Sequence, residues 1–217
     1  MSLLNLTPDE VLSTTRAVRR RLDFSQPVER HLIEECLRIA QQAPSGSNSQ
    51  GWQFVVVTDA EKRKALADLY RRSWANYLEQ PSFIGKLQFD DEERNTVQQR
   101  TASSAQYLAD HLHEVPVLVI PCIARNRATF TASNQAGFFG SIIPASWSFC
   151  LAARARGLGT CWTTLHLQYE EEAAAVLGIP YANVIQVALI PLAHTKGTDF
   201  KPAPRDSIEK IVHWESW

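Results

Sequence analysis

The chain has 217 residues, of which 45% are hydrophobic and 21% are charged, and its formal net charge is −1. This length and composition fit one well-packed globular domain covering 1–217, and they exclude collagen-like and intrinsically disordered classes. Because the charge is nearly balanced, the field of the whole protein gives no reason to expect nucleic acid or another polyanion as a partner.

The first half of the chain predicts mainly helices. A short helix should begin at TPDE, 7–10, because Thr caps helices, Pro suits the first turn and acids favour that end. Further helices are expected at 28–42 and 60–78 from apolar residues at helical spacing, and a polar helix is expected at about 91–113. Segment 52–58 is almost wholly apolar and predicts a strand buried on both faces. Segment 79–90 predicts a loop.

The second half alternates strands with helices. Strands are expected at 115–122, about 159–164 and 183–191, and a helix at 169–177. The uncharged segment 128–153 is long enough to span a bilayer, but Asn134, Gln135 and Pro144 interrupt its apolar character. We therefore expect a helix at about 134–155 that is buried on all sides in a soluble protein. The pattern as a whole predicts one α+β domain with helices on both sides of a sheet.

The cysteines and histidines predict neither a disulfide framework nor a metal site. No Cys-x-x-Cys pair occurs among Cys36, Cys122, Cys150 and Cys161, which favours free buried thiols in a reducing cytosol. His111 and His113 are two residues apart, so a helix would point them in different directions and they could not share a metal. The N-terminus lacks the order of a secretory signal. We expect a cytoplasmic protein.

Four arginines lie within six positions of the segment TTRAVRRRLDF, namely Arg16, Arg19, Arg20 and Arg21. A guanidinium group suits phosphate because it forms two parallel charge-assisted hydrogen bonds. Arg16 and Arg19 would share a face if the segment were helical. A solvated basic surface explains the same residues equally well, and no basic stripe elsewhere supports nucleic-acid binding.

The loop APSGSNSQGW, 43–52, lies between a predicted helix and a predicted strand. Gly46 and Gly51 have the spacing of a Walker A loop, but Trp52 replaces the required Lys. The GxSxG turn of a serine hydrolase is also missing. The many short polar side chains suit hydrogen bonds to a polar planar ligand. On turn chemistry alone, however, a capped turn is the favoured interpretation.

The stretch GLGTCWTT, 157–164, matches a dinucleotide fingerprint only in part. It lacks the third glycine and follows a helix, not a strand, so a Rossmann fold is excluded. Thr163 and Thr164 could contact a ligand at the end of the predicted strand. Paired threonines are nevertheless more often simple strand formers.

Four segments in this order resemble the FMN-dependent nitroreductases. They are TTRAVRR, APSGSNSQGWQFVVV, ARGLGTCWTTL and FKPAPRDSIEKIVHW. The resemblance covers about 14–214 and implies a nitroreductase-like mixed central sheet flanked by helices in an intertwined homodimer. FMN would lie at the dimer interface, to which the apolar helix would contribute, since an obligate interface resembles a domain core cut in half. A charge at Ile142 would then break the dimer, and the C-terminal tail would reach across the partner.

The resemblance also implies a cofactor-binding set drawn from several segments. These are Arg16, Ala17, Arg19 and Arg205 for the FMN phosphate and ribityl chain, Thr163, Thr164 and Leu165 for the isoalloxazine ring, and Ser45, Gly46 and Asn48 from the other subunit. Two positions depart from the family pattern. Where relatives often have Arg-Arg-Ser, this chain has Thr15-Arg16-Ala17, so one arginine and one hydroxyl group are missing.

In enzymes of this kind the flavin performs the chemistry, and the protein binds and orients it. The resemblance implies that NADH or NADPH reduces FMN, which then reduces a nitroaromatic, quinone or similar small planar acceptor in a ping-pong reaction. No catalytic side chain is expected. The alternatives are a dehalogenating or flavin-cleaving relative, and a non-catalytic protein that stores or senses FMN.

Residues 70–113 are a candidate substrate lid. Within it, Trp74, Tyr77, Phe83 and Phe89 could form an aromatic slot for a flat substrate. Aromatic residues at such spacing also pack against a core, and we slightly favour that interpretation.

Overall fold

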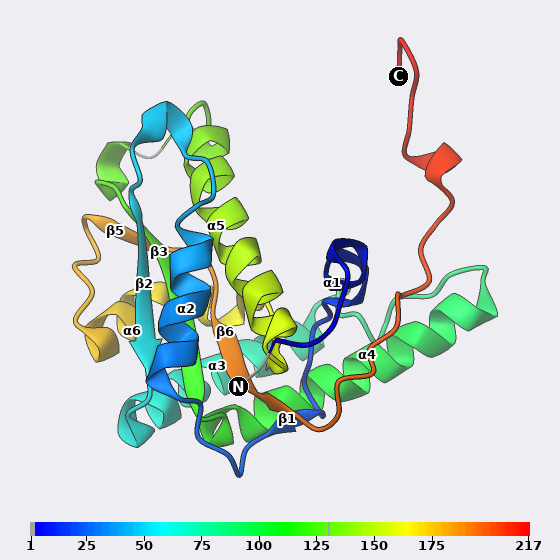
Figure 1. The fold of residues 1–217 in the computed structure, drawn as a ribbon, viewed down its shortest axis with the longest axis horizontal. Helices are drawn as coiled ribbons and strands as arrows, with labels where there is room; N and C mark the ends of the chain where they lie inside the picture. Colours follow the sequence, from blue (N-terminus) through cyan, green and yellow to red (C-terminus); the bar gives the residue numbers. More distant parts are fainter. Residues whose placement is uncertain (1–2, 130) are drawn as a thin grey trace.

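The computed structural model describes residues 3–129 and 131–217 as an α+β fold (Figure 1). The helices are α1 (Pro8–Thr14), α2 (Arg30–Ala40), α3 (Ala60–Glu79), α4 (Glu92–His111), α5 (Gln135–Ala155) and α6 (Glu170–Leu177). The strands are β1 (Leu22–Asp23), β2 (Trp52–Val57), β3 (Val117–Ala124), β4 (Leu158–Thr160), β5 (Val184–Gln186) and β6 (Ile190–Thr195). The long elements lie close to their expected positions.

The strands form one sheet in the order β1-β6-β3-β2, with β4 beside β6 and β5 beside β3. Each pair of named strands is antiparallel, whereas the resemblance implied a mixed sheet. The parallel contact is an isolated bridge between Ala17 and Thr160. This bridge attaches the arginine-rich segment to β4.

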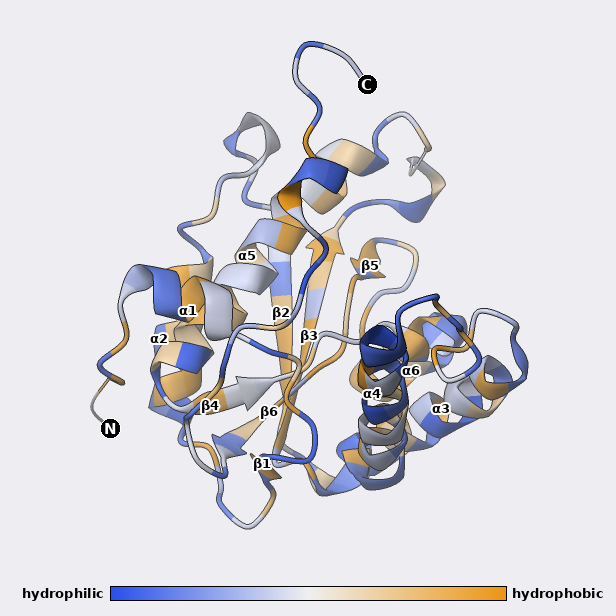
Figure 2. Cartoon of the chain, turned by 90° about the vertical axis from the view of Figure 1, so that its right-hand side faces the viewer, coloured by the Kyte–Doolittle hydropathy of each residue, from blue (hydrophilic) through white to orange (hydrophobic). Residues whose placement is uncertain are grey.

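Helices cover both faces of the sheet, as the sequence predicted. Alternate residues of a strand point to opposite faces, and Val117 and Val119 of β3 accordingly pack with α2 and α5. Leu118 and Ile120 face the other way, into a core shared with α3, α4 and α6. Figure 2 shows the hydrophobic residues gathered in the central strands and polar residues along α4.

Three strands differ from the expected ones. The strand expected at about 159–164 is the short β4, which ends at Thr160 and leaves Thr163 and Thr164 outside it. β2 lies at the edge of the sheet and Val57 is its one buried residue, so the expected burial on both faces is wrong for the single chain. The strand expected at 183–191 is divided into β5 and β6. The break is a change of register against β3, where residues 187–189 lie opposite Ile120 and Pro121. Val187 N still donates to the Pro121 carbonyl (2.9 Å).

The helix α5 is buried on one side only, so the expected burial on all sides is wrong. Ile143 is 43% exposed and Trp147 is 42% exposed. Ala136 and Gly140 are also exposed and extend the same stripe at helical spacing. By length and composition α5 could also cross a membrane, but one such helix is weak evidence for a membrane protein. The chain therefore presents an uncharged, partly aromatic helix face to its surroundings.

Gly159 allows β4 to approach the arginine-rich segment closely. A methyl group on its Cα would lie 2.7 Å from Thr195 Cγ2, 2.9 Å from Leu22 Cδ2 and 3.0 Å from Val18 Cγ1. We expect Gly159→Ala to lower the free energy of unfolding by about 1–3 kcal/mol, because overpacking displaces these neighbours. Urea denaturation followed by circular dichroism measures the change.

Gly51→Ala is a matched control for this prediction. Its added methyl group would meet the nearest atoms at 3.9 Å, an ordinary van der Waals distance. The control should unfold close to the wild-type midpoint. If Gly159→Ala were as stable as wild type, the close packing at β4 would not be what requires the glycine.

All four cysteines are free and buried, as the sequence predicted. Burial raises the pKa of the Cys36 thiol to about 11. It raises the pKa of Cys122 and of Cys150 to about 12, and it also raises the pKa of Cys161. The thiols are therefore protonated at neutral pH and are poorly suited to act as nucleophiles.

Candidate functional site

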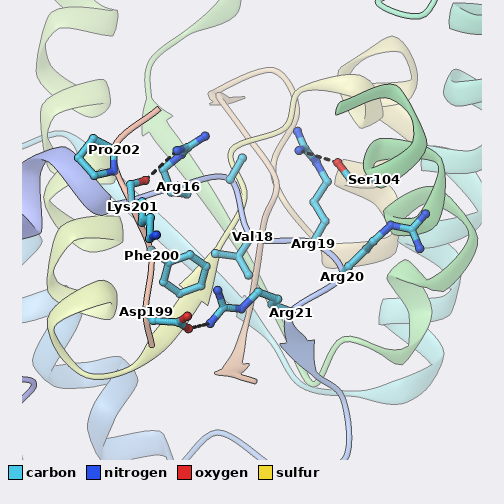
Figure 3. Close-up of a pocket in the computed structure, with 11 residues that line it drawn as sticks. Arg16, Val18, Arg19, Arg20, Arg21, Ser104, Asp199, Phe200, Lys201 and Pro202 are labelled. Atoms are coloured by element: carbon cyan, nitrogen blue, oxygen red, sulfur yellow. Dashed lines mark hydrogen bonds and ion pairs between the residues drawn. The ribbon is translucent and has the colours of Figure 1, made fainter. Parts of the chain in front are cut away.

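The arginine-rich segment runs along the edge of β4 and then turns, so the expected helical alignment of Arg16 and Arg19 is wrong. Val18 N donates to the Thr160 carbonyl (2.8 Å), which fixes the segment to the sheet. Both arginines nevertheless line one cavity of about 430 Å³. Figure 3 shows their side chains on either side of Val18.

The cavity has two walls. One wall is residues 199–202, which we call the strap. Arg16 Nη1 donates to the Lys201 carbonyl in this wall (2.9 Å). Arg21 Nη2 forms an ion pair with Asp199 in the same wall (2.6 Å). The other wall is α4, where Arg19 Nη1 donates to Ser104 Oγ (3.3 Å; Figure 3). The arginine-rich segment thus joins the strap to α4.

Positive charge accumulates in this cavity. Within the described part of the chain, Arg16 and Arg19 form no ion pair with a carboxylate. Burial lowers the pKa of Arg16, and repulsion from Arg205 lowers it further, which places Arg205 close by. Arg205 lines a separate cavity between the tail and α4, which Asp91, Glu93 and Asp206 also line. Two guanidinium groups that repel one another are a donor set that a phosphate group would satisfy.

The run 163–165 follows β4 and connects to the same region. Thr163 N donates to the Leu189 carbonyl (3.1 Å), and Leu189 N donates to the Thr163 carbonyl (2.8 Å). Burial raises the pKa of Tyr70 to about 12, and the Thr163 side chain and Arg19 both oppose that rise. Tyr70 therefore lies near both Thr163 and Arg19, which places the run beside the arginine-rich segment.

The turn after Thr163 offers backbone groups to a ligand. Thr164 is exposed, and a short 3-10 helix, Leu165–Tyr169, begins at the next residue. The first N–H groups of a helix have no acceptor within it. His166, the second residue of this 3-10 helix, is fully buried. Burial lowers its pKa to about 4, against an opposing effect of the Gln186 side chain, so the imidazole is neutral at neutral pH.

The loop 43–52 has a strained backbone. Ser47, Asn48 and Gln50 have positive φ angles of 53°, 50° and 49°. Residues in such conformations cost of order 1–3 kcal/mol each and concentrate at functional sites. Gln50 N donates to Ser45 Oγ (3.0 Å), so Ser45 does cap a turn, as the simpler interpretation expected. The strain, however, favours an additional binding role.

The loop is held against the first half of α5. Gly46 N donates to Ser141 Oγ (3.0 Å). Ser45, Gly46 and Asn48 therefore lie at one end of α5, whereas β4 and the arginine-rich segment lie beyond the other end (Figure 1). The helix between Ser141 and Ala155 alone spans about 20 Å at 1.5 Å per residue. One chain therefore does not bring the two groups of candidate residues together.

The four aromatic residues between 74 and 89 do not form a slot. Trp74 is buried, and its ring meets those of Tyr77 and Phe83 edge to face at 5.8 and 5.9 Å between centroids. Its Nε1 donates to Gln106 Oε1 (2.7 Å). Phe89 lies apart, under the Arg94 guanidinium group (3.8 Å). Packing against the core, which we favoured, accounts for the first three rings.

Sequence reasoning missed the residues that complete the cavity. Ser104 comes from α4, and Asp199, Phe200 and Lys201 come from the strap. Their positions depend on how α4 and the tail pass the arginine-rich segment, and no local pattern signals that contact. Arg100 of α4 was missed for the same reason.

Several known proteins resemble the chain along most of its length. The 4-nitrobenzoate reductase of Pseudomonas putida is 28% identical, over 84% of this chain and 88% of that protein. Iodotyrosine deiodinase 1 of Rattus norvegicus is 24% identical, over 94% of this chain and 67% of that protein.

Solved structures share the fold. The FMN and NADPH-dependent nitroreductase NfnB from sphigopyxis sp. strain HMH superposes with a TM-score of 0.67 at 21% identity, over 98% of this chain and 100% of that chain. Oxidized iodotyrosine deiodinase bound to FMN and 3-iodo-L-tyrosine superposes with a TM-score of 0.69 at 19% identity, over 96% of this chain and 99% of that chain.

The fold and the site define an α+β protein with a cationic cavity beside the edge of its sheet. A model of the nitroreductase family matches residues 12–194. The chain belongs to that family.

Proposed function

We propose that the protein is an FMN-dependent oxidoreductase that takes electrons from NADH or NADPH and passes them to a small planar acceptor. The observation that carries this proposal is the cationic cavity around Arg16, which the run 163–165 adjoins, in a chain of the nitroreductase family. Solved relatives are described as binding FMN and depending on NADPH. The four free thiols support a cytoplasmic location.

The residues present fit the cofactor. Arg16 and Arg205 would hold the phosphate group, because neither has a carboxylate partner within the described residues and each repels the other. Arg19 would meet the ribityl chain, and the exposed turn at Thr164 and Leu165 would meet the ring with its backbone N–H groups. Bound FMN would supply the hydride chemistry. The nearby positive charge and N–H donors would stabilise negative charge on the reduced ring.

A second copy of the chain completes this site in our proposal. The strained loop lies too far along α5 to reach the cavity of its own chain. The exposed stripe of α5, with Ile143 and Trp147, is an apolar surface suited to self-association. In the tail, Trp214 is 82% exposed and Trp217 is fully exposed, as expected of a segment that packs on a partner. The protein would then be a homodimer with FMN at the interface.

The acceptor in our proposal is a nitroaromatic, a quinone or a similar planar compound, as the 4-nitrobenzoate reductase relative suggests. Dehalogenation is the second candidate, because iodotyrosine deiodinase 1 matches almost the whole chain. The 5,6-dimethylbenzimidazole synthase of Rhodospirillum rubrum matches 64% of this chain, so a reaction of that kind has weaker support.

An anaerobic titration tests the proposed function. The protein is loaded with FMN and mixed with NADH or NADPH while the visible flavin absorbance is followed. We expect rapid bleaching, and then recovery of the absorbance when a nitroaromatic or quinone is added. FMN binding without bleaching would indicate a storage or sensing protein. A protein that takes up no FMN would contradict the whole proposal.

Ala17 offers a gain-of-function test of the phosphate site. The family pattern has a serine hydroxyl where this chain has Ala17, which is exposed beside Arg16. We expect Ala17→Ser to tighten FMN binding by about 2- to 12-fold, since one added hydrogen bond contributes roughly 0.5–1.5 kcal/mol. Fluorescence titration of the apoprotein with FMN measures the effect. Ala17→Cys is the control, because it adds a similar volume but only a weak donor. Equal tightening in both variants would speak against a hydroxyl contact.

A further inference from the structure

We infer that a second anion-binding subsite lies beside the proposed FMN site, where Arg20 contacts α4 near Arg100 of that helix. In this inference the subsite holds a negatively charged group of the molecule that exchanges electrons with the flavin. It therefore rests on the proposed function and deepens it. The shared chemistry is a carboxylate or phosphate group, carried by the acceptor or by the nicotinamide donor.

The subsite is continuous with the FMN cavity. A hollow of about 520 Å³ is lined by Arg20, Gln99, Arg100, Ser103 and Ser104. Arg20 and Ser104 also line the cavity that contains Arg16. In Figure 3, Arg20 turns toward α4, away from the strap. A ligand above the proposed cofactor could therefore extend along α4 into this hollow.

Arg20 is held in place before any ligand binds. Its Nη2 donates to Ser103 Oγ (3.0 Å) and to the Ser103 carbonyl (3.3 Å). Its guanidinium group also lies over the Tyr107 ring, 5.0 Å from the centroid. A planar guanidinium that is already positioned loses less conformational entropy when it binds an anion. A merely solvated arginine would need none of these contacts.

The two arginines of this corner lack acidic partners within the described residues. Arginines elsewhere commonly pair with carboxylates, as in Arg30–Glu34, Arg38–Glu34, Arg71–Asp68, Arg72–Glu172, Arg94–Asp206, Arg127–Glu170 and Arg156–Glu35. Across 3–129 and 131–217, neither Arg20 nor Arg100 forms an ion pair with a carboxylate. Elsewhere Arg63 donates to the carbonyls of Thr58, His113 and Val115, and Arg125 lies over the Phe138 ring. Arg20 and Arg100 instead line one hollow together with no carboxylate among its lining residues, which suits an external anion.

The proposed cofactor does not use up this positive charge. A phosphate monoester carries about −1.5 to −2 at neutral pH, which Arg16 and Arg205 would balance. Arg21 is already paired with Asp199. Arg20 and Arg100 are left for another anion, which the reacting molecule would supply.

The experiment compares charged and neutral members of matched pairs on the FMN-loaded protein. In the acceptor arm, photoreduced protein is oxidised by 4-nitrobenzoate or by neutral 4-nitrobenzamide. In the donor arm, oxidised protein is reduced by NADPH, by NADH or by the neutral donor 1-benzyl-1,4-dihydronicotinamide. Stopped-flow measurements give an apparent dissociation constant for each compound. Calorimetry with benzoate and benzamide adds a binding readout that involves no turnover.

The variants are Arg20→Gln, Arg100→Gln and the double variant, with Lys64→Gln as a control that removes an exposed cation from α3. In one arm, the double variant should raise the dissociation constant of the charged compound by about 10-fold or more, the size expected from losing a charged hydrogen bond. The neutral compound should change little. The affected arm identifies which molecule carries the anion.

Two results would overturn the inference alone while the wild type is still reduced and reoxidised. One is that the double variant and the wild type have the same ratio of dissociation constants for the charged and neutral compounds in both arms. The other is an equal rise in the dissociation constant of the charged compound in Lys64→Gln, which would reflect the net charge of the protein and not a subsite. If no donor reduces the wild type, the proposed function fails, and the inference fails with it.

Discussion

Arg205→Ala should weaken FMN binding roughly 10- to 150-fold, the loss expected from charged hydrogen bonds worth about 1.5–3 kcal/mol. Arg205 lies near Arg16, whose pKa it helps to lower. Its one hydrogen bond among the described residues goes to the carbonyl of the adjacent Pro204 (3.0 Å). The guanidinium group is therefore free to bind phosphate. Fluorescence titration of the apoprotein with FMN measures the loss.

Lys210→Ala is the matched control, because Lys210 lies in the same tail but pairs with Asp206 (3.8 Å). Its removal should leave FMN affinity close to wild type. Equal losses in the two variants would indicate a general effect of charge in the tail. Unchanged affinity in Arg205→Ala would remove Arg205 from the phosphate site.

Ile143→Glu should convert the proposed dimer to monomers and release FMN at the same time. Ile143 is 43% exposed in the single chain, so a glutamate there can remain hydrated in a folded monomer. In the dimer the same carboxylate would be buried without a partner, which costs several kcal/mol. Size-exclusion chromatography with light scattering gives the oligomeric state, and circular dichroism confirms that the monomer is folded.

Ile142 is the wrong position for this test, contrary to the sequence-based expectation. It is fully buried within the chain, in a cluster with Ile123 and Ile185. Ile142→Glu should therefore unfold the protein, and it serves as the comparison that separates folding from association. A folded monomer of Ile143→Glu that retains FMN would contradict a shared interface.

The long elements were predictable because their apolar residues repeat at regular spacing. In α3, Leu66, Tyr70 and Trp74 follow helical spacing and all are buried. The divided strand was not predictable from its own residues, because the break is a change of register against β3, where residues 187–189 lie opposite Ile120 and Pro121. The course of the arginine-rich segment was missed for a similar reason. Its extended form depends on the hydrogen bond from Val18 to Thr160, a contact between residues far apart in sequence.

Part of the candidate site could also be predicted. The density of arginines around Arg16 and Arg19 indicates an anion, whatever their backbone conformation. The strain in the loop was hidden, because Ser47 has a positive φ that serine seldom adopts. The separation of the two groups of residues became visible only once α5 was seen to lie between them, with Ser141 contacting the loop.

The claim that each FMN site is built from two copies of the chain can be tested with a mixed dimer. One copy carries Arg205→Ala, and the other carries Ser45→Ala with Asn48→Gly. The two copies are coexpressed with different tags and purified through both. In a shared arrangement one site contains both defects and the other contains neither. The measurement is the number of tightly bound FMN molecules per mixed dimer. We predict one tightly bound FMN per mixed dimer. A mixed dimer with no tightly bound FMN would contradict the shared site, because two sites that are each built within a single chain would both be defective.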